Sequence, residues 1–122
     1  MTSRILQRTL IAAAALGLAA CASPTPPTDQ MAVSTAAVAS AATAGGATWA
    51  PAEMLTARDK LRQANEAMDS KDYGRARTLA QQSQVDAQLA EAKVRAGKAG
   101  KAADEVRDAT RALSDEMKRK TQ

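Results

Sequence analysis

The sequence contains no histidine and no phenylalanine, and it has one cysteine, one tryptophan and one tyrosine. The absence of histidine excludes imidazole general bases, and a lone Cys21 excludes both an internal disulfide and a Cys/His zinc site. Two aromatic side chains provide no stacking platform for nucleic-acid bases. We therefore expect no enzyme, no metal, no nucleic-acid partner and no small-molecule substrate.

Alanine is what the sequence has in excess. The chain has 122 residues, of which 31 are alanine, so alanine supplies more than half of the 45% hydrophobic content. This length allows one domain at most. Long stretches that are rich in alanine and have few glycines favour helix, and the expected fold class is all-α.

The first 20 residues are typical of a lipoprotein signal peptide. Arg4 and Arg8 form a positive amino-terminal region, and residues 10–18 form an apolar run. Nine residues are too few to cross the roughly 30 Å of hydrocarbon in a membrane, for which a helix needs about 20 residues. We therefore set residues 1–20 apart from the folded protein.

The tetrapeptide Leu18-Ala19-Ala20-Cys21 resembles the lipobox of bacterial lipoproteins. The resemblance implies cleavage before Cys21, diacylglycerol on its thiol and an acyl chain such as palmitate on its new amine. This covalent lipid is the only cofactor-like group that we expect. Ala22 stands where lipoproteins retained in the inner membrane often have Asp. By resemblance to that sorting rule, the expected location is the periplasmic face of the outer membrane.

Residues 21–48 read as the lipidated cysteine followed by a flexible tether. Pro24, Pro26 and Pro27 favour extended polyproline conformation. The Ala/Ser/Thr/Val stretch at 31–44 predicts a frayed helix at best, because Ser, Thr and Val weaken the preference of alanine for helix. Gly45 and Gly46 predict an end to any such helix.

The region 49–120 predicts two antiparallel helices joined by a polar turn. Pro51 and Glu53 are typical of a helix start, and Asp69-Ser70-Lys71-Asp72 interrupts the pattern, with Ser70 or Asp72 available as the next cap. Apolar residues of the first helix recur in steps of three and four. They are Ala50, Met54, Ala57, Leu61, Ala64 and Met68.

The second helix is expected to run from about 72 to 119. Its first apolar stripe comprises Tyr73, Ala76, Ala80, Ser83, Ala87, Ala90 and Val94. A second stripe keeps its phase through Gly97 and Gly100, which favours one long helix over a break at these glycines. That stripe comprises Val85, Leu89, Ala92, Ala96, Ala99, Ala103, Val106, Thr110, Leu113 and Met117.

The second helix is too long for the first to cover. At 1.5 Å per residue it measures about 72 Å, against about 30 Å for the first. The uncovered stripe therefore predicts self-association or an envelope protein partner. The interaction seam that we expect consists of Val85, Leu89, Val106, Leu113 and Met117.

The charged residues fit solvated helix surfaces. Asp104–Arg107 and Asp108–Arg111 have ion-pair spacing, so the carboxylates at 104–108 and at 66–72 carry no expected catalytic or metal-binding role. Lys118, Arg119 and Lys120 complement a helix carboxyl end. They are also candidate contacts to anionic lipid headgroups or to peptidoglycan.

Residues 50–55, 57–61 and 71–80 resemble a family of short bacterial outer-membrane lipoproteins. The resemblance covers about residues 45–96. That family carries an alanine-rich helical domain of unknown function, which also occurs joined to OmpA-like modules. The resemblance implies a location and a fold but no activity and no catalytic residue.

The sequence thus predicts a lipid-anchored periplasmic helical protein with a structural or protein-interaction role in the cell envelope. Two alternatives stay open. One is an accessory subunit of a specific envelope assembly or transport complex. The other is a lipoprotein associated non-covalently with peptidoglycan.

Overall fold

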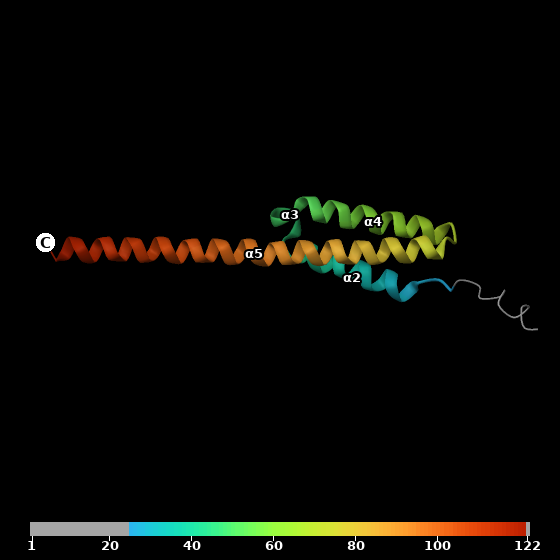
Figure 1. Ribbon diagram of the computed structural model, residues 1–122, viewed down its shortest axis with the longest axis horizontal. Helices are drawn as coiled ribbons and strands as arrows, with labels where there is room; N and C mark the ends of the chain where they lie inside the picture. The colour runs from blue at the N-terminus through green and yellow to red at the C-terminus, as the bar shows by residue number, and fades with distance from the viewer. Residues whose placement is uncertain (1–24, 122) are drawn as a thin grey trace, which may run out of the picture.

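The structure is a computed structural model that describes residues 25–121, all helix apart from short connections (Figure 1). Cys21 and the expected signal peptide lie outside the described residues. The helices are α2 (Thr28–Ala44), α3 (Gly46–Trp49), α4 (Pro51–Asp69) and α5 (Tyr73–Lys120). The expected all-α fold with a long second hairpin helix is confirmed.

The α4–α5 hairpin is antiparallel, and two ion pairs fix its register. Lys60 pairs with Asp86 at 2.6 Å, and Glu53 pairs with Lys93. The two residue numbers of each ion pair sum to 146, and a constant sum is what two antiparallel helices without a shift in register require. Of the two caps that the sequence offered, Asp72 is the one used, since its side chain accepts a hydrogen bond from the Arg75 backbone N–H at 3.1 Å.

Helix α5 is continuous from Tyr73 to Lys120 and passes through Gly97 and Gly100 without interruption. The expected single helix is therefore confirmed. A glycine costs only up to about 1 kcal/mol within a helix, which the surrounding alanines and charged residues with good helix propensity outweigh. The first predicted stripe is also confirmed, because its members from Ala76 to Val94 are buried.

The prediction of a flexible tether over residues 21–48 is wrong from residue 28 onward. Residues 28–44 form the ordered helix α2, and residues 46–49 form α3. The physical reason is an apolar stripe with steps of three, four and three that packs against the hairpin. Its members, Met31, Ser34, Val38 and Ala41, are all buried. The two-helix hairpin is therefore a three-helix bundle.

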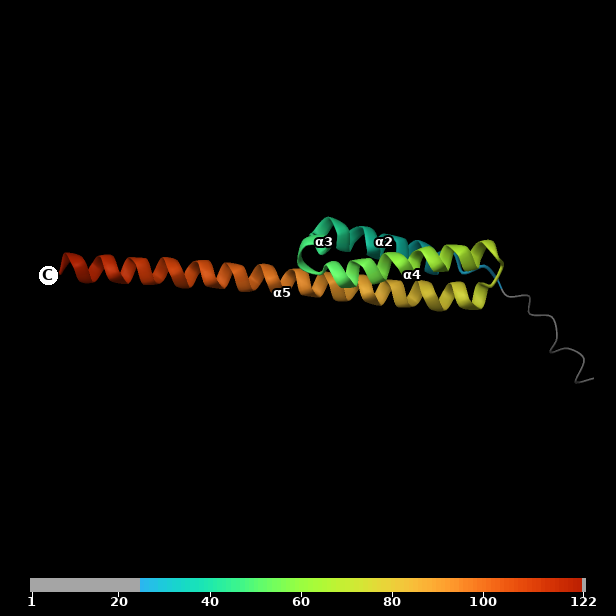
Figure 2. The ribbon, with the colours of Figure 1, turned by 90° about the horizontal axis from the view of Figure 1, so that it is seen from above.

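Helix α2 runs parallel to α5 and antiparallel to α4. The Gln30 side-chain amide donates to the Gln84 side-chain oxygen, and the Lys98 ammonium donates to the Ala44 carbonyl, each at 2.9 Å. Both pairs are 54 residues apart in sequence, so the two helices stay in register along the length of α2. Figure 2 shows α2, α4 and the first half of α5 side by side.

Two glycines make the corner between α2 and α4. Gly45 has a φ of 105°, the left-handed conformation that ends a helix and that glycine adopts without strain. A Cβ on Gly46 would lie 2.7 Å from the Ala41 carbonyl oxygen and 2.7 Å from Met54 Cγ. The Met54 side chain, 1% exposed, fills that space, so this corner is closed from inside by methionine.

Small residues line the contact between α4 and α5. Ala57 and Ala87 are fully buried, and the Ser83 hydroxyl donates to the Ala57 carbonyl at 2.7 Å. A side chain can bond to the backbone of another helix in this way only where the two helices approach closely. The bundle is therefore held by close backbone packing more than by large side chains.

Candidate interaction surface

The bundle ends at Gly97 and Lys98, roughly halfway along α5. A Cβ on Gly97 would lie 2.7 Å from Cζ3 of Trp49, so the indole ring of α3 rests directly on the α5 backbone at this point. One residue later, Lys98 binds the last carbonyl of α2. These two contacts form the end of the bundle, and α5 continues beyond them as a single helix (Figure 1).

We call residues 99–120 the arm. Every residue of the arm is exposed except Glu116, which is partly exposed. Figures 1 and 2 show the arm without a neighbouring helix in either view. The amino-terminal end of the described chain lies at the other end of the molecule, beside the α4–α5 turn. The tip of the arm and the start of the folded chain are thus at opposite ends.

All five residues of the predicted interaction seam are on the surface. Val85 and Leu89 lie on the bundle half of α5, and their exposures are 61% and 47%. Val106, Leu113 and Met117 lie on the arm, with exposures of 65%, 64% and 63%. Side chains of this size are seldom left open in a row on one helix. The structure therefore leaves the seam free for a partner, while binding itself stays a prediction.

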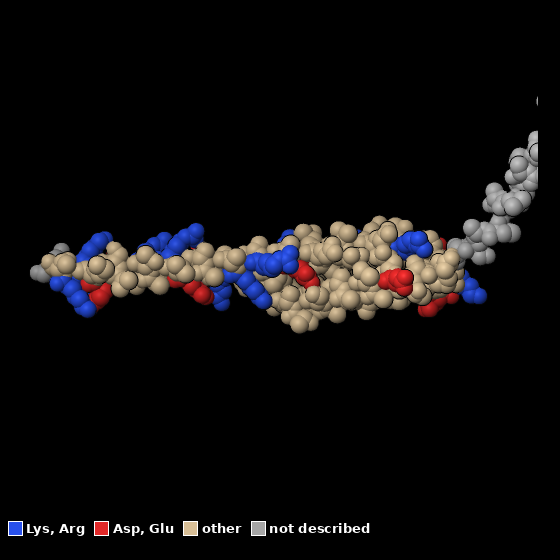
Figure 3. Space-filling model, turned by 90° about the horizontal axis from the view of Figure 1, so that it is seen from below, with Lys and Arg blue, Asp and Glu red and all other residues tan. Residues whose placement is uncertain are grey.

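The charges of the arm pair with one another along α5. Asp104 binds Arg107 at 2.6 Å and Asp108 binds Arg111 at 3.0 Å, as their spacing predicted. Figure 3 shows blue and red side chains next to one another along the arm. Such exposed pairs add a few tenths of a kcal/mol to a helix. These ion pairs support the helix of the arm and involve no residue of the seam.

The basic tip is partly neutralised within its own helix. Glu116 forms ion pairs with both Arg119 at 2.5 Å and Lys120 at 3.6 Å. Lys118 borders a shallow surface hollow together with Leu113 and Met117. The three candidate envelope contacts therefore lie together beside the end of the seam, and one carboxylate offsets part of their charge.

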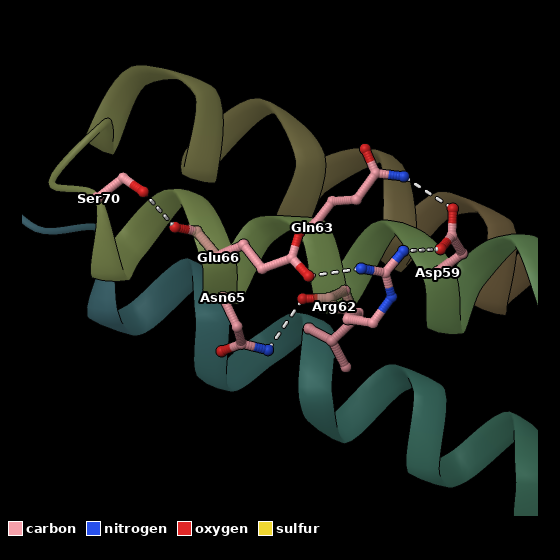
Figure 4. Close-up of polar contacts among 7 residues, drawn as sticks. Asp59, Arg62, Gln63, Asn65, Glu66 and Ser70 are labelled. Atoms are coloured by element: carbon pink, nitrogen blue, oxygen red, sulfur yellow. Dashed lines mark hydrogen bonds and ion pairs between the residues drawn. The ribbon is translucent and has the colours of Figure 1, made fainter.

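The acidic residues of α4 have the same structural role. Arg62 bridges Asp59 and Glu66 on the solvated face of the helix, and Gln63 donates to Asp59 as well (Figure 4). The hydrogen bond that Arg62 donates to Asp59 is the main cause that lowers the pKa of Asp59, and the hydrogen bonds that Arg62 donates to Asp59 and Glu66 raise its own pKa. The arrangement stabilises α4.

Residues 25–121 hold no group of three or more His, Cys, Asp or Glu side chains that are placed to bind a metal ion. Among the described helices, none combines the length and the apolar character needed to cross a membrane.

Sequence reasoning missed three features of the structure. It did not find α2, although Met31, Ser34, Val38 and Ala41 have helical spacing in a stretch with little charge. It also did not find the contact between Trp49 and Gly97, since neither residue belongs to a repeating pattern. The exposed Leu55, 72% open on α4, also lies outside the predicted seam.

Comparison with known proteins agrees with this architecture. A search of curated proteins gave no match. Among solved structures, the chain is similar to the crystal structure of a DUF4398 family protein from Pseudomonas aeruginosa PAO1. The sequence identity is 36%, the TM-score is 0.69, and the match covers 73% of this chain and 92% of the other.

The family comparison covers most of the bundle and the beginning of the arm. The family model described as "Domain of unknown function (DUF4398)" matches residues 29–106. The match begins at the start of α2, in agreement with the structural start of the domain, and ends at Val106 of the arm. The chain belongs to the DUF4398 family.

Proposed function

We propose that this chain is a lipid-anchored, non-enzymatic protein of the bacterial cell envelope that presents the arm of α5 as a docking helix. The proposed location is the periplasmic face of the outer membrane, and the proposed anchor is lipid on Cys21. The observation that carries the proposal is the arm itself. Residues 99–120 extend a continuous helix beyond the bundle with its apolar seam uncovered.

The anchor is supported by sequence and by chain length. The segment Leu18–Cys21 resembles a lipobox and ends a typical signal peptide. Thr25, the first described residue, lies beside Tyr73 and Arg77 at the start of α5. Four residues span at most about 14 Å, so lipid on Cys21 would hold this end of the bundle close to the membrane surface.

Such an anchor would direct the arm away from its attachment point. Helix α5 starts at the anchored end and is about 72 Å long at 1.5 Å per residue. The bundle acts as a rigid base, because α2 and α4 brace the first half of α5 through helical contacts in register. A role in linking or organising envelope components suits a stiff rod that has lipid at one end and an apolar seam at the other.

Two substitutions test the anchor and its location. We expect Cys21→Ser to release the protein from membrane fractions, and Ala22→Asp to move it from the outer to the inner membrane. Mass spectrometry of the mature wild-type protein should find an acylated cysteine at its amino terminus. An unmodified mature amino terminus would contradict the lipid anchor.

In-cell cross-linking tests the docking role. A photo-reactive residue at Leu113, on the seam, should capture a protein partner. The matched control at Asp115 is on the same exposed turn but faces about 160° away, at 100° per residue over two residues. Equal capture from both positions, or from neither, would contradict docking through the seam.

A further inference from the structure

The back of α5 carries an apolar seam that faces away from the bundle core. Ala96 follows the buried Ala87 by nine residues, which is two and a half helical turns and so half a revolution. From residue 92 onward the members of this back seam are Ala92, Ala96, Ala99, Ala103, Val106, Thr110, Leu113 and Met117, and the same stripe continues towards the start of α5 with Leu89 and Val85. All of them are exposed. A helix approaching the back seam therefore meets neither α2 nor α4.

Between residues 92 and 117 the back seam is graded in size. Its first half, from Ala92 to Ala103, consists of four alanines. Its second half, from Val106 to Met117, consists of four larger residues. The two halves have the same spacing, with steps of four, three and four. The larger half would therefore fit the smaller half of another seam, if that seam ran in the opposite direction.

We propose that the occupant of the back seam is a second copy of this chain, bound antiparallel. With a two-fold axis between residues 104 and 105, each larger residue faces an alanine of the second copy. The four facing pairs are Val106 with Ala103, Thr110 with Ala99, Leu113 with Ala96, and Met117 with Ala92. Every layer then has one large and one small member, and the two helices keep an even separation.

A parallel pair lacks this fit. In parallel register each residue faces its own copy, so alanine meets alanine over the first half and leucine and methionine meet themselves over the second. The helices would have to lie close together at one end and apart at the other. Straight helices cannot do both without leaving gaps.

The charges that border the seam also favour the antiparallel pair. Glu116 directly precedes Met117 and Arg95 directly precedes Ala96, so in this register Glu116 of one copy and Arg95 of the other lie on the same edge of the paired back seam. The Arg95 side chain is 72% exposed and within its own helix pairs with Glu91 at 3.6 Å. The other positions that border the back seam are Lys93, Gly100, Ala102, Arg107, Ala109 and Ser114. In this register Lys93 lies opposite Ser114, Arg107 opposite Gly100, and Ala102 opposite Ala109. No two like charges therefore lie opposite each other along the paired back seam. The ion pair between Glu116 and Arg95 favours the same register as the size grading.

The proposed pair is a rod with a bundle at each end. The amino ends of the two α5 helices lie about 95 Å apart, from 63 helical rises of 1.5 Å. The paired strip from 92 to 117 is about 38 Å long and buries on the order of 500 Å² on each copy, below the standard interface size. The pair should therefore exchange with monomer on dilution. This inference rests on the proposed docking role of the arm, and it names the partner.

Sedimentation of the full chain in mild detergent, with Cys21→Ser, tests the pairing. We expect a monomer–dimer equilibrium. Leu113→Glu should raise the dissociation constant about 100-fold, because it places an unpaired charge against Ala96 of the second copy. Ala112→Glu, one residue and about 100° away, should change it by less than about twofold. Since the arm lies outside the bundle, circular dichroism should show both variants to be fully folded.

Cysteine cross-linking tests the orientation in the same Cys21→Ser background. A mixture of Ala92→Cys and Met117→Cys proteins should form mixed disulfides on oxidation. Neither variant alone should form them efficiently, since its two cysteines would lie roughly 38 Å apart in the pair. A disulfide between two Met117→Cys chains at the same rate would show parallel pairing and overturn the proposal.

The outcomes also separate this inference from the docking role. A chain that stays monomeric at about 0.1 mM, whose Leu113 nevertheless captures another protein in cells, overturns the second copy as occupant and leaves the docking role standing. A monomer with no partner captured through Leu113 overturns both. A dimer that Leu113→Glu leaves unchanged overturns the back seam as its interface.

Discussion

The indole ring of Trp49 lies against the backbone of Gly97, at the point where α5 leaves the bundle. A side chain at residue 97 would occupy the space of the ring, since its Cβ would come within 2.7 Å of Trp49 Cζ3. Gly100, about one turn further along on the open arm, has free space on its side-chain face, where a Cβ would meet no neighbouring atom within 4 Å. The contact with Trp49 therefore requires glycine at position 97, whereas no neighbouring atom requires it at position 100.

We predict opposite effects for alanine at these two glycines. Gly97→Ala should destabilise the bundle, because overpacking costs about 1–3 kcal/mol and the helix propensity of alanine returns at most about 1 kcal/mol. Gly100→Ala should leave the unfolding midpoint unchanged or raise it. Urea denaturation followed by circular dichroism measures both.

Trp49→Ala provides the control for this prediction. In a chain that already carries Trp49→Ala, the cost of Gly97→Ala should disappear, since the ring that it displaces is gone. If Gly97→Ala destabilises the chain equally in both backgrounds, then contact with the indole is not the cause.

The two buried serines make a second matched pair. The Ser83 hydroxyl bonds to the Ala57 carbonyl across the α4–α5 contact. The Ser34 hydroxyl is buried in α2 and finds no hydrogen-bond partner within residues 25–121. We predict that Ser83→Ala lowers the free energy of unfolding by about 1 kcal/mol, whereas Ser34→Ala leaves it unchanged or raises it. If urea denaturation shows the same loss of unfolding free energy for both variants, the distinction between the bonded and the unbonded hydroxyl is wrong.

The success and the failure of the sequence analysis have a common physical origin. The α4–α5 hairpin was predictable, because Pro51, the turn at 69–72 and two stripes with helical spacing all agree. Helix α2 was not predictable, since its Ser, Thr and Val have weak helix propensity. The helical spacing of Met31 and Val38 was therefore not taken as evidence of an ordered helix. Packing against α5 stabilises α2 as a helix, although its intrinsic helix propensity is weak.

The candidate surface divides in the same way. The exposed seam at Val106 and Leu113 was predictable, because a stripe longer than its covering helix has to stay open. The end of the bundle at Gly97 was not predictable. It depends on one aromatic ring meeting one glycine 48 residues away in sequence, and neither belongs to a periodic pattern.

The ion pair between Glu53 and Lys93 predicts a loss of stability in acid. The hydrogen bond from Lys93 is the main cause that lowers the pKa of Glu53 below its ordinary value of 4.5. A carboxyl group whose pKa is lower in the folded state stabilises the fold above its unfolded pKa, and this contribution is lost as the pH falls through the folded pKa. Thermal midpoints should therefore fall as the pH drops below about 4.5.

Two variants assign this acid sensitivity to the pair. Glu53→Gln removes the titrating group and Lys93→Gln removes its donor, so each should flatten the midpoint-against-pH curve in acid relative to the wild type. A curve as steep as that of the wild type in both variants would show that other carboxylates determine the acid response.

The pairing of Glu116 with Arg95 of a second copy makes a reciprocal prediction. Glu116→Arg would place two cations against each other, and Arg95→Glu would place two anions there, so each should weaken the dimer by roughly threefold to tenfold. In the double variant the charges are exchanged and still opposite, so the dissociation constant should return towards that of the wild type. Sedimentation at low salt measures all three.

Asp115→Arg is the matched control for this exchange. It makes the same change of charge one residue away on a position that does not border the seam, so its effect on the dissociation constant should be within about twofold. Within one chain Glu116 also forms ion pairs with Arg119 and Lys120, and Arg95 forms one with Glu91. The two replacements remove these pairs in monomer and dimer alike. Recovery in the double variant therefore reports on the contact between copies, whereas additive losses from the two single changes would exclude it.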